Sequence, residues 1–404
     1  YDGIWQMLHP DRGAVSLGLL LPLGISFYTF QSMGYLIDQY RDSGEGEKNF
    51  FKFLLFVSFF PQLIQGPINR FGQMKPQFDA EHSFCWEKAK HALFLMLFGL
   101  LKKYAIADLL SGTVAAILDA PGSDMPGSVI VAGILMYSAQ QYADFSGGID
   151  LVLGIAELFG IEMMPNFRQP YFAVSLADFW RRWHITLGTW MKDYIFYPMS
   201  LSKKMNKFGK WGKKHFGNTF GRTLPICFAN IVIFFIVGIW HGAAWKYIAY
   251  GLYNGFIIAI SNLLEPVYKK LLSKFHINAT SRGWTLWQII RTFILVNIGW
   301  YFDMADSVSQ ALCMIRWSIQ GLSFSQLNSS LLDLGIEARD YIIIIAGCII
   351  VFIISVLKEK GIAIRESIAA KPLAVRWIAY YALIAVILIF GYIGATQGFI
   401  YANF

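Results

Sequence analysis

Residues 237–245 read VGIWHGAAW and join two apolar runs, residues 231–237 and residues 247–264. His241 stands at this junction. An imidazole ring is polar and needs a partner when it is buried, and it titrates near neutral pH, which suits proton transfer. Gly238 and Gly242 flank the ring and leave little side-chain bulk in the way of a ligand. Two interpretations follow: a structural histidine bonded to a carbonyl at a helix end, or a group that moves protons.

The composition indicates the class of protein. The chain has 404 residues, of which 56% are hydrophobic and 15% are charged, whereas a soluble domain carries about 25% charged residues. Long apolar runs recur along the chain and lack the alternation of a transmembrane barrel. The expected fold class is therefore all-α: a polytopic membrane helix bundle with broken, re-entrant and in-plane helices.

The net charge and the cysteines limit which ligands and partners are expected. The net charge is +8, from 34 Lys and Arg against 26 Asp and Glu. In a membrane protein this excess indicates cytoplasmic loops and contact with anionic lipid headgroups, and no nucleic acid is expected. The four cysteines are scattered, so they predict neither a disulfide framework nor a metal site. They are Cys85, Cys227, Cys313 and Cys348.

The apolar runs predict the membrane topology. Spans are expected at residues 128–142, 224–240, 247–264, 286–302, 341–357 and 377–396. Prolines and glycines break the runs at residues 17–37 and 50–68, and residues 172–198 are amphipathic enough to lie in the membrane plane or line a cavity. Residues 203–222 contain seven Lys or Arg and no acid, which predicts that this stretch lies on the cytoplasmic side. Residues 303–340 are predicted to be an outer loop, and residues 358–376 a basic inner one.

Charged residues within or beside the apolar runs need an explanation. Lys102 and Lys103 interrupt one run, so either two segments meet at an interface there or the lysines extend to the membrane surface. Asp144 and Asp150 follow a predicted span and are interpreted as helix caps. Asp144, at the end of that span, is the better candidate for a functional role.

Two histidines, His184 and His241, lie in unusual settings. A histidine in a water-poor pocket can act as general base toward a hydroxyl that attacks an activated carbonyl. The candidate donors to the developing oxyanion are Trp183, Trp240, Asn166 and Arg182. The alternative for the tryptophans is an aromatic belt at the membrane surface, and the alternative for Arg182 is a headgroup contact. Two distant histidines make a weak zinc site, so no metal is expected.

Several motifs are absent from the sequence. There is no Walker loop and no GxGxxG after a strand, which argues against a soluble nucleotide-binding domain. There is also no GxSxG elbow, so serine-type nucleophilic catalysis has no support.

Longer motifs suggest a family. WHGAAW at residues 240–245, FWRRWHITLGTW at residues 179–190 and KDY at residues 192–194 resemble the membrane-bound O-acyltransferase (MBOAT) family. The branch they resemble contains the bacterial membrane proteins of alginate and peptidoglycan O-acetylation, with the teichoic-acid D-alanylation protein a more distant relative. Further matches are LPLGISFYTF (21–30), FPQ (60–62), GPI (66–68), GL (99–100), KK (102–103), IAD (106–108), YADFSG (142–147), NF (166–167), PY (170–171) and FIY (399–401).

The resemblance implies a fold and a site. It implies one membrane-embedded domain over residues 1–404, around a tunnel or funnel and without the family's N-terminal spans. His241 corresponds to the catalytic histidine and His184 to a second histidine of this branch. The expected substrate-binding residues are Asn166, Arg182, Trp183, Asp193, Trp240 and Asp144. Arg168 departs from the small amide expected after Asn166-Phe167, which leaves the substrate open.

The resemblance also implies a reaction. An acyl group, acetyl in the first instance, passes from a cytoplasmic thioester (acetyl-CoA or an acyl-carrier protein) to a hydroxyl of an extracytoplasmic cell-envelope polysaccharide. Transfer through a partner acyltransferase or esterase-like protein is part of the expectation, as are a multi-pass location in the bacterial cytoplasmic membrane and the absence of a bound cofactor. The alternatives are D-alanyl transfer to teichoic acid, a transporter or flippase without acyl chemistry, and a scaffold for envelope assembly.

Overall fold

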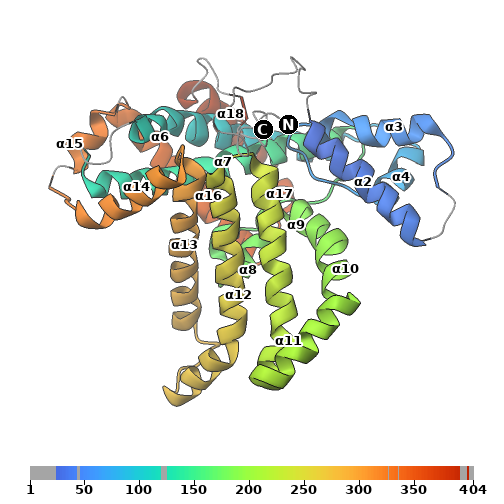
Figure 1. Ribbon diagram of the computed structural model, residues 1–404. Helices are drawn as coiled ribbons and strands as arrows, with labels where there is room; N and C mark the ends of the chain where they lie inside the picture. The colour runs from blue at the N-terminus through green and yellow to red at the C-terminus, as the bar shows by residue number, and fades with distance from the viewer. Residues whose placement is uncertain are drawn as a thin grey trace, which may run out of the picture. The chain divides into compact units, whose positions relative to one another are not determined.

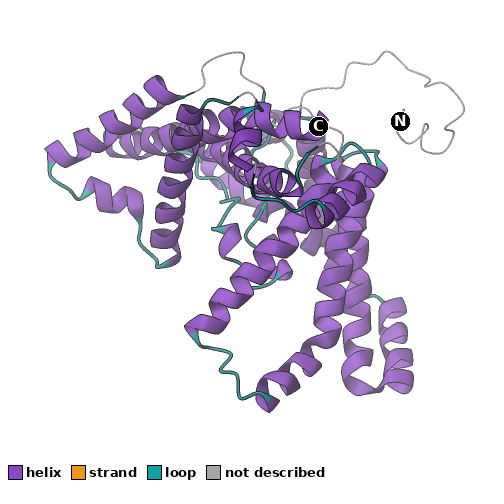
Figure 2. Ribbon diagram, turned by 90° about the vertical axis from the view of Figure 1, so that its left-hand side faces the viewer, coloured by secondary structure: helices purple, strands orange, loops and turns teal. Residues whose placement is uncertain are grey.

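The computed structural model describes residues 24–42, 46–119, 125–325, 327–334, 336–391 and 398–399. Within these residues the chain forms helices joined by loops and turns, with no strand (Figure 2). Four of the described helices are long and apolar enough to cross a membrane. The predicted fold class, an all-α polytopic membrane protein, is confirmed. The tunnel or funnel stays a prediction, as does the single domain.

Contacts within the chain define two compact units, and each is described by itself. The first unit is Pro170–Arg316. Its elements are a 3₁₀ turn at Pro170–Phe172, α8 (Leu176–Trp180), α9 (Ile185–Met191), a π-helical turn at Lys192–Phe196, α10 (Tyr197–Ser200), α11 (Lys203–His241), α12 (Trp245–Lys274), α13 (Arg282–Met304) and the start of α14 (Val308–Gln320). Helices α11, α12 and α13 lie side by side (Figure 1).

The second unit is Leu21–Gln169 with Trp317–Phe404. Its described elements are α2 (Ile25–Asp42), α3 (Phe50–Ser58), a 3₁₀ turn at Phe60–Gln62, α4 (Phe71–Asp79), α5 (Trp86–Lys102), a π-helical turn at Lys103–Ala107, α6 (Asp108–Asp119), α7 (Gly127–Leu158), the end of α14, α15 (Leu327–Leu332), α16 (Ala338–Glu359), α17 (Ile364–Ala369) and α18 (Leu373–Phe390).

The helices that could span a membrane are α11, α12, α16 and α18. They cover the predicted spans at residues 224–240, 247–264 and 341–357 and most of the span at residues 377–396, of which residues 392–396 lie outside the described residues. Residues 128–142 and 286–302 are helical too, in α7 and α13, but these helices do not meet the same criteria of length and composition. Buried polar side chains on α7, among them Gln140 and Gln141, lower its apolarity.

The basic stretch at residues 203–222 forms a helical hairpin at the start of α11. Gly217 has a φ of 82°, a left-handed conformation that glycine adopts readily, and it separates two helical arms. The arms run antiparallel in close contact: a Cβ on Gly212 would lie 3.1 Å from the Cα of Gly221. Most residues of the stretch tolerate a helix, so its high positive charge is compatible with this hairpin. Its location on the cytoplasmic side stays a prediction.

Lys102 and Lys103 belong to a buried ionic cluster in the second unit. A π-helical turn joins α5 to α6 without a break, and both lysines are buried. Lys102 pairs with Asp150 at 2.6 Å, and Lys103 pairs with Asp144 at 2.6 Å and with Asp108 at 2.8 Å. Neither sequence interpretation of the lysines holds. The prediction of Asp144 and Asp150 as helix caps is also wrong, because both lie within α7, where they neutralise the lysines.

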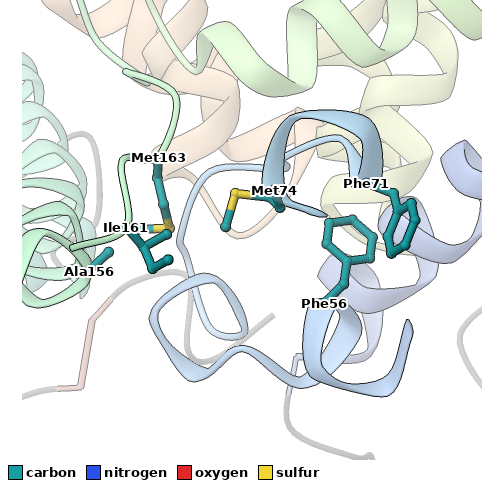
Figure 3. Close-up of a cluster of buried hydrophobic side chains, with 6 residues drawn as sticks. All are labelled: Phe56, Phe71, Met74, Ala156, Ile161 and Met163. Carbon is teal, nitrogen blue, oxygen red and sulfur yellow. The ribbon is translucent and has the colours of Figure 1, made fainter. Parts of the chain in front are cut away.

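The predicted break at residues 50–68 is confirmed. Helix α3 ends at Ser58, a 3₁₀ turn follows, and the backbone stays non-helical until α4 begins at Phe71. Its polar side chains are bonded within the protein: the Asn69 amide donates to Gln62 Oε1 at 2.9 Å. Beside it, Phe56 and Phe71 approach with ring centroids 5.3 Å apart in the cluster shown in Figure 3. Burial of both the polar and the apolar groups lets an irregular segment persist here.

Two predicted loops are partly helical. Residues 303–340, predicted as an outer loop, contain α14 and α15, and residues 358–376 contain the short helix α17. Residues 172–198 form four short helical pieces in place of one amphipathic helix. Short pieces expose more helix ends than one long helix does, and these ends place side chains such as His184 at turns.

Candidate functional site

The WHG motif lies where two of the long helices meet. Helix α11 ends at His241, α12 begins at Trp245, and the amide of Gly242 donates to the carbonyl of Ile239 at 3.2 Å. The His241 side chain is buried, with 9% of its surface exposed. A short connection between two tightly packed helices therefore fixes the position of the imidazole.

Glycines let α11 and α12 pack backbone against backbone. A Cβ on Gly238 would lie 2.5 Å from the carbonyl oxygen of Tyr247, and one on Gly251 would lie 2.2 Å from that of Phe234. A Cβ on Gly242 would lie 2.6 Å from the Tyr247 ring. The sequence predicted that Gly238 and Gly242 leave space for a ligand beside His241. In the structure α12 occupies that space, and Tyr247 fills it.

His184 reaches the same site from a strained turn. It precedes α9 with φ 47° and ψ 54°, a left-handed conformation that is uncommon for a residue other than glycine. Its side chain is 2% exposed. The turn lies between α8, which ends at Trp180, and α9, which begins at Ile185. Backbone strain of this kind persists where the surrounding structure holds the side chain in place.

Asp178 holds that turn together, and sequence reasoning missed it. Its carboxylate accepts from Arg182 Nε at 2.9 Å and from the backbone N–H of Val174 at 3.3 Å. Its own N–H donates to the Ser175 hydroxyl, which caps α8. The signal was present in the sequence: Asp178 stands four residues before Arg182, the spacing of a helical ion pair.

Trp240 lies next to both histidines. Its ring centroid is 5.9 Å from that of His184 and 4.9 Å from that of His241. The two histidines, far apart in the sequence, therefore belong to one site in the first unit. We call this group the histidine cluster: His184, Trp240, His241, Tyr247, Tyr250 and Trp300.

Aromatic rings complete the histidine cluster. The His241 ring stacks on Tyr247 with centroids 6.2 Å apart and meets the edge of Tyr250 at 6.3 Å. Tyr250 stacks in turn on Trp300 at 5.6 Å. These partners were not predicted, since they come from α12 and α13 and share no sequence motif with the histidines. Rings on several sides exclude water from the imidazoles.

The electrostatic setting keeps His184 neutral. Burial, with the neighbouring His241 as a second cause, lowers the pKa of His184 from 6.5 to about 3. A neutral imidazole has one N–H donor and one acceptor nitrogen, so it can both accept and donate a hydrogen bond. Asp303, at the end of α13, is close enough for its charge to act on both His241 and Tyr247.

The remaining predicted residues divide between the two units. Trp183 is buried in the first unit and stacks on Phe179 at 5.5 Å, adjacent to Trp300. Arg182 is held by Asp178, which uses its Nε donor within the chain. Asp193 lies half-buried in the π-helical turn Lys192–Phe196.

Asn166 and Asp144 lie in the second unit and are both buried. The carboxylate of Asp144 is bound by Lys103 at 2.6 Å, so it already has a structural partner. A role for either residue in substrate binding stays a prediction.

Two hydrogen bonds join α8 to α12 beside the histidine cluster. The indole N–H of Trp180 donates to Asn254 Oδ1 at 3.0 Å, and the Asn254 amide donates to the carbonyl of Tyr250 at 2.9 Å. Asn254 thereby links α8 to α12. The arrangement can hold imidazole groups neutral, dry and fixed in position, as a general base requires.

The fold and this site define the class. Residues 45–305 match the sequence model of the MBOAT, membrane-bound O-acyltransferase family, so the chain belongs to that family and is an integral membrane protein. The match includes both histidines and the whole histidine cluster.

Three relatives illustrate the similarity. The chain is 35% identical to the probable alginate O-acetylase AlgI of Pseudomonas aeruginosa over 77% of its own length and 54% of that protein. It is 33% identical to the peptidoglycan O-acetyltransferase of Helicobacter pylori over 78% of its length and 60% of that protein. It is 28% identical to the teichoic acid D-alanyltransferase of Bacillus subtilis over 74% of its length and 72% of that protein. The chain thus spans a little over half the length of the two O-acetylating relatives.

Proposed function

We propose that this chain is the membrane-embedded part of an O-acyltransferase that acetylates a hydroxyl of an extracytoplasmic cell-envelope polysaccharide. The observation that carries the proposal is the histidine cluster, in which two buried imidazoles share one tryptophan neighbour. The names of the alginate and peptidoglycan relatives support acetyl as the group and an envelope polymer as the acceptor. The bacterial cytoplasmic membrane is the proposed location.

The proposed chemistry assigns His241 as general base. It takes the proton of the acceptor hydroxyl as that oxygen attacks the thioester carbonyl, so a C–O bond forms while negative charge collects on the carbonyl oxygen. As the C–S bond breaks, the imidazolium returns the proton to the leaving thiolate. General base catalysis of this kind contributes about 10²–10⁴-fold. His184 orients the acyl group or assists the proton transfer.

The donor and the partners are part of the proposal. The donor is a cytoplasmic acyl thioester, acetyl-CoA or an acyl-carrier protein, and it is a co-substrate, not a bound cofactor. An extracytoplasmic acyltransferase or esterase-like partner receives the acyl group or passes it on. The Trp183 and Trp240 indoles are the proposed donors to the developing oxyanion, since both lie within or beside the histidine cluster.

Donor turnover tests the proposal. Purified protein in lipid nanodiscs receives radiolabelled acetyl-CoA, and in parallel an acetylated acyl-carrier protein. We expect thioester loss with the native chain and none with His241→Ala. The matched control is His215→Ala, since His215 is an exposed histidine whose Nδ1 contacts only the Trp211 carbonyl at 2.8 Å in its own helix. Turnover retained by His241→Ala would reject the assignment of the base.

A second acyl group has a specific observation in its favour. Of the three relatives described above, the teichoic acid D-alanyltransferase of Bacillus subtilis is the one of which the chain covers the largest share, 72%. D-alanyl transfer is therefore the alternative. D-alanyl-loaded carrier protein in the same assay distinguishes the two, because only one of the donors should be consumed in a His241-dependent way.

A further inference from the structure

A cavity in the second unit lies outside the histidine cluster and has no role in the proposed reaction. It has a volume of about 250 Å³, is open on one side and is lined by α5, the end of α16, α17 and the link between the last two. Phe94, Leu95 and Phe98 contribute from α5, and Ile354 and Lys358 from α16. All of these elements belong to the same unit.

The level of the cavity in the membrane follows from α16. This helix is one of the four candidate spans. Its apolar run, residues 341–357, would be about 26 Å long at 1.5 Å per residue, close to the roughly 30 Å thickness of a bilayer's hydrocarbon core. Lys358 is the first charged residue after that run, so it lies where the hydrocarbon gives way to headgroups.

The wall of the cavity combines apolar and charged side chains. The Lys358 ammonium lies 6.0 Å from the centroid of the Phe98 ring, and no carboxylate of the described chain pairs with it. Arg365 also lines the cavity, but its guanidinium is bound to Glu157 at 2.7 Å. Glu366 contributes a carboxylate to the wall. Lys358 is therefore the cation most available to an anionic ligand.

Arg365 also explains why the cavity keeps its form. Its ion pair with Glu157 ties α17 to the end of α7, with both side chains about one-third exposed. Helix α17 is thereby held across the gap between α5 and α16. A pre-formed cavity loses less conformational entropy on binding than one that must open first.

We propose that this cavity binds a membrane phospholipid, with the phosphate at Lys358 and the start of an acyl chain against Phe94, Leu95, Phe98 and Ile354. An ammonium group at headgroup depth attracts a lipid phosphate, and basic pockets between spanning helices suit lipid headgroups. The apolar side of the cavity excludes a free phosphate ion as the preferred ligand, since that ion would leave the rings uncovered. The site is independent of the acyl-transfer proposal.

Photo-crosslinking tests the site. The protein is placed in phosphatidylcholine nanodiscs that contain a small fraction of phosphatidylglycerol or phosphatidylethanolamine with a diazirine near the glycerol, and the labelled peptides are identified. We expect labelling of the α5, α16 and α17 peptides, reduced about tenfold by Lys358→Gln and retained by Lys358→Arg. Lys360→Gln is the matched control, because Lys360 is exposed and does not line the cavity.

The outcomes separate the possible ligands. Equal labelling by the two lipids supports recognition of their shared phosphate, and labelling by one alone supports a headgroup contact in addition. Loss of labelling in Ala363→Trp, which fills the cavity, supports the location. Unchanged labelling in Lys358→Gln, or competition by inorganic phosphate as effective as by lipid, would overturn the proposal.

Discussion

The two units accommodate their buried polar side chains in different ways. In the second unit the ionic cluster buries charged groups and pairs each lysine with a carboxylate: Lys102 with Asp150, and Lys103 with Asp144 and Asp108. In the first unit the histidine cluster buries groups that can be neutral, and it surrounds them with rings. Ion pairs keep the first set of groups charged, whereas burial keeps His184, in the second set, neutral.

This difference separates a structural site from a chemical one. A buried ion pair resists any change in charge, because removing one partner leaves the other unpaired in a medium of low dielectric constant. A buried neutral imidazole needs no counter-charge, and its acceptor nitrogen can take a proton from a substrate hydroxyl for the duration of a reaction. The ionic cluster should therefore matter for stability, and the histidine cluster for turnover.

The largest expected effect is on turnover. We expect His241→Ala to lower acyl transfer by about 10²–10⁴-fold, the range for loss of a general base, while the unfolding temperature in detergent stays close to that of the native chain. Transfer and thermal unfolding are measured on the same preparations. A loss of transfer that merely follows a loss of folded protein would place His241 with the structural residues and remove the contrast.

Lys103→Met should act mainly on stability, in contrast to His241→Ala. It leaves Asp144 and Asp108 buried without their cation, which should lower the free energy of unfolding by about 3–5 kcal/mol. Chemical unfolding in detergent micelles measures the change. Adding Asp144→Asn to Lys103→Met should recover part of the loss, because one of the two stranded charges is removed. A variant as stable as the native chain would show that the cluster is not held by its charges.

The pH dependence of stability sharpens the comparison. Unfolded His184 takes up a proton near its ordinary pKa of 6.5, whereas the folded residue does so only near 3. The unfolded state therefore binds more protons between these values, and stability should fall as the pH drops below 6.5, by about 2 kcal/mol at pH 5. Thermal unfolding from pH 7.5 to pH 5 measures the slope.

The variant that tests this slope is His184→Asn, since asparagine tolerates the left-handed conformation at this position. It should flatten the dependence, whereas His215→Asn, at an exposed site, should leave it unchanged. An unaltered slope in His184→Asn would mean that another group causes the acid sensitivity.

The smallest effect is expected at the surface. Lys52 pairs with Asp79 at 2.5 Å, as close as the pairs of the ionic cluster, but the two side chains are 45% and 36% exposed. Lys52→Met should therefore change the free energy of unfolding by less than about 1 kcal/mol, because water screens the pair. The same unfolding assay compares it with Lys103→Met. A cost as large as that of the buried lysine would show that burial does not set the scale.

The sequence predicted the long spans and the pair of histidines, because apolar runs and tryptophan-rich motifs are local signals. It did not predict the ionic cluster, since Lys103 and Asp144 come from different helices and no local sequence pattern links the two residues. Charged residues inside apolar runs do indicate ion pairs, because an unpaired charge is costly there. The residues concerned are Lys102, Lys103, Asp144 and Asp150. The basic hairpin was missed for a different reason, because positive charge reports membrane side and says nothing about helix or loop.

Tyr250 could not be predicted, because it reaches His241 from the facing helix and contacts the site only in three dimensions. Asp178 differs, because its spacing to Arg182 is a local signal that predicts the ion pair, but not that the pair holds the turn before His184. Asn166 and Asp144 were candidates from their settings in the sequence and Asp193 from the family resemblance, and a role in substrate binding stays a prediction for all three.

The π-helical turn at Lys103–Ala107 makes the winding of the helix, as well as residue type, a condition for the ionic cluster. A π turn accommodates one residue more than an α turn, so residues five apart, such as Lys103 and Asp108, lie on one face of it. In a regular α-helix, at 3.6 residues per turn, residues five apart point about 140° away from each other. A chain that kept every charged side chain, but wound this segment as a regular α-helix, would lose the Lys103–Asp108 pair.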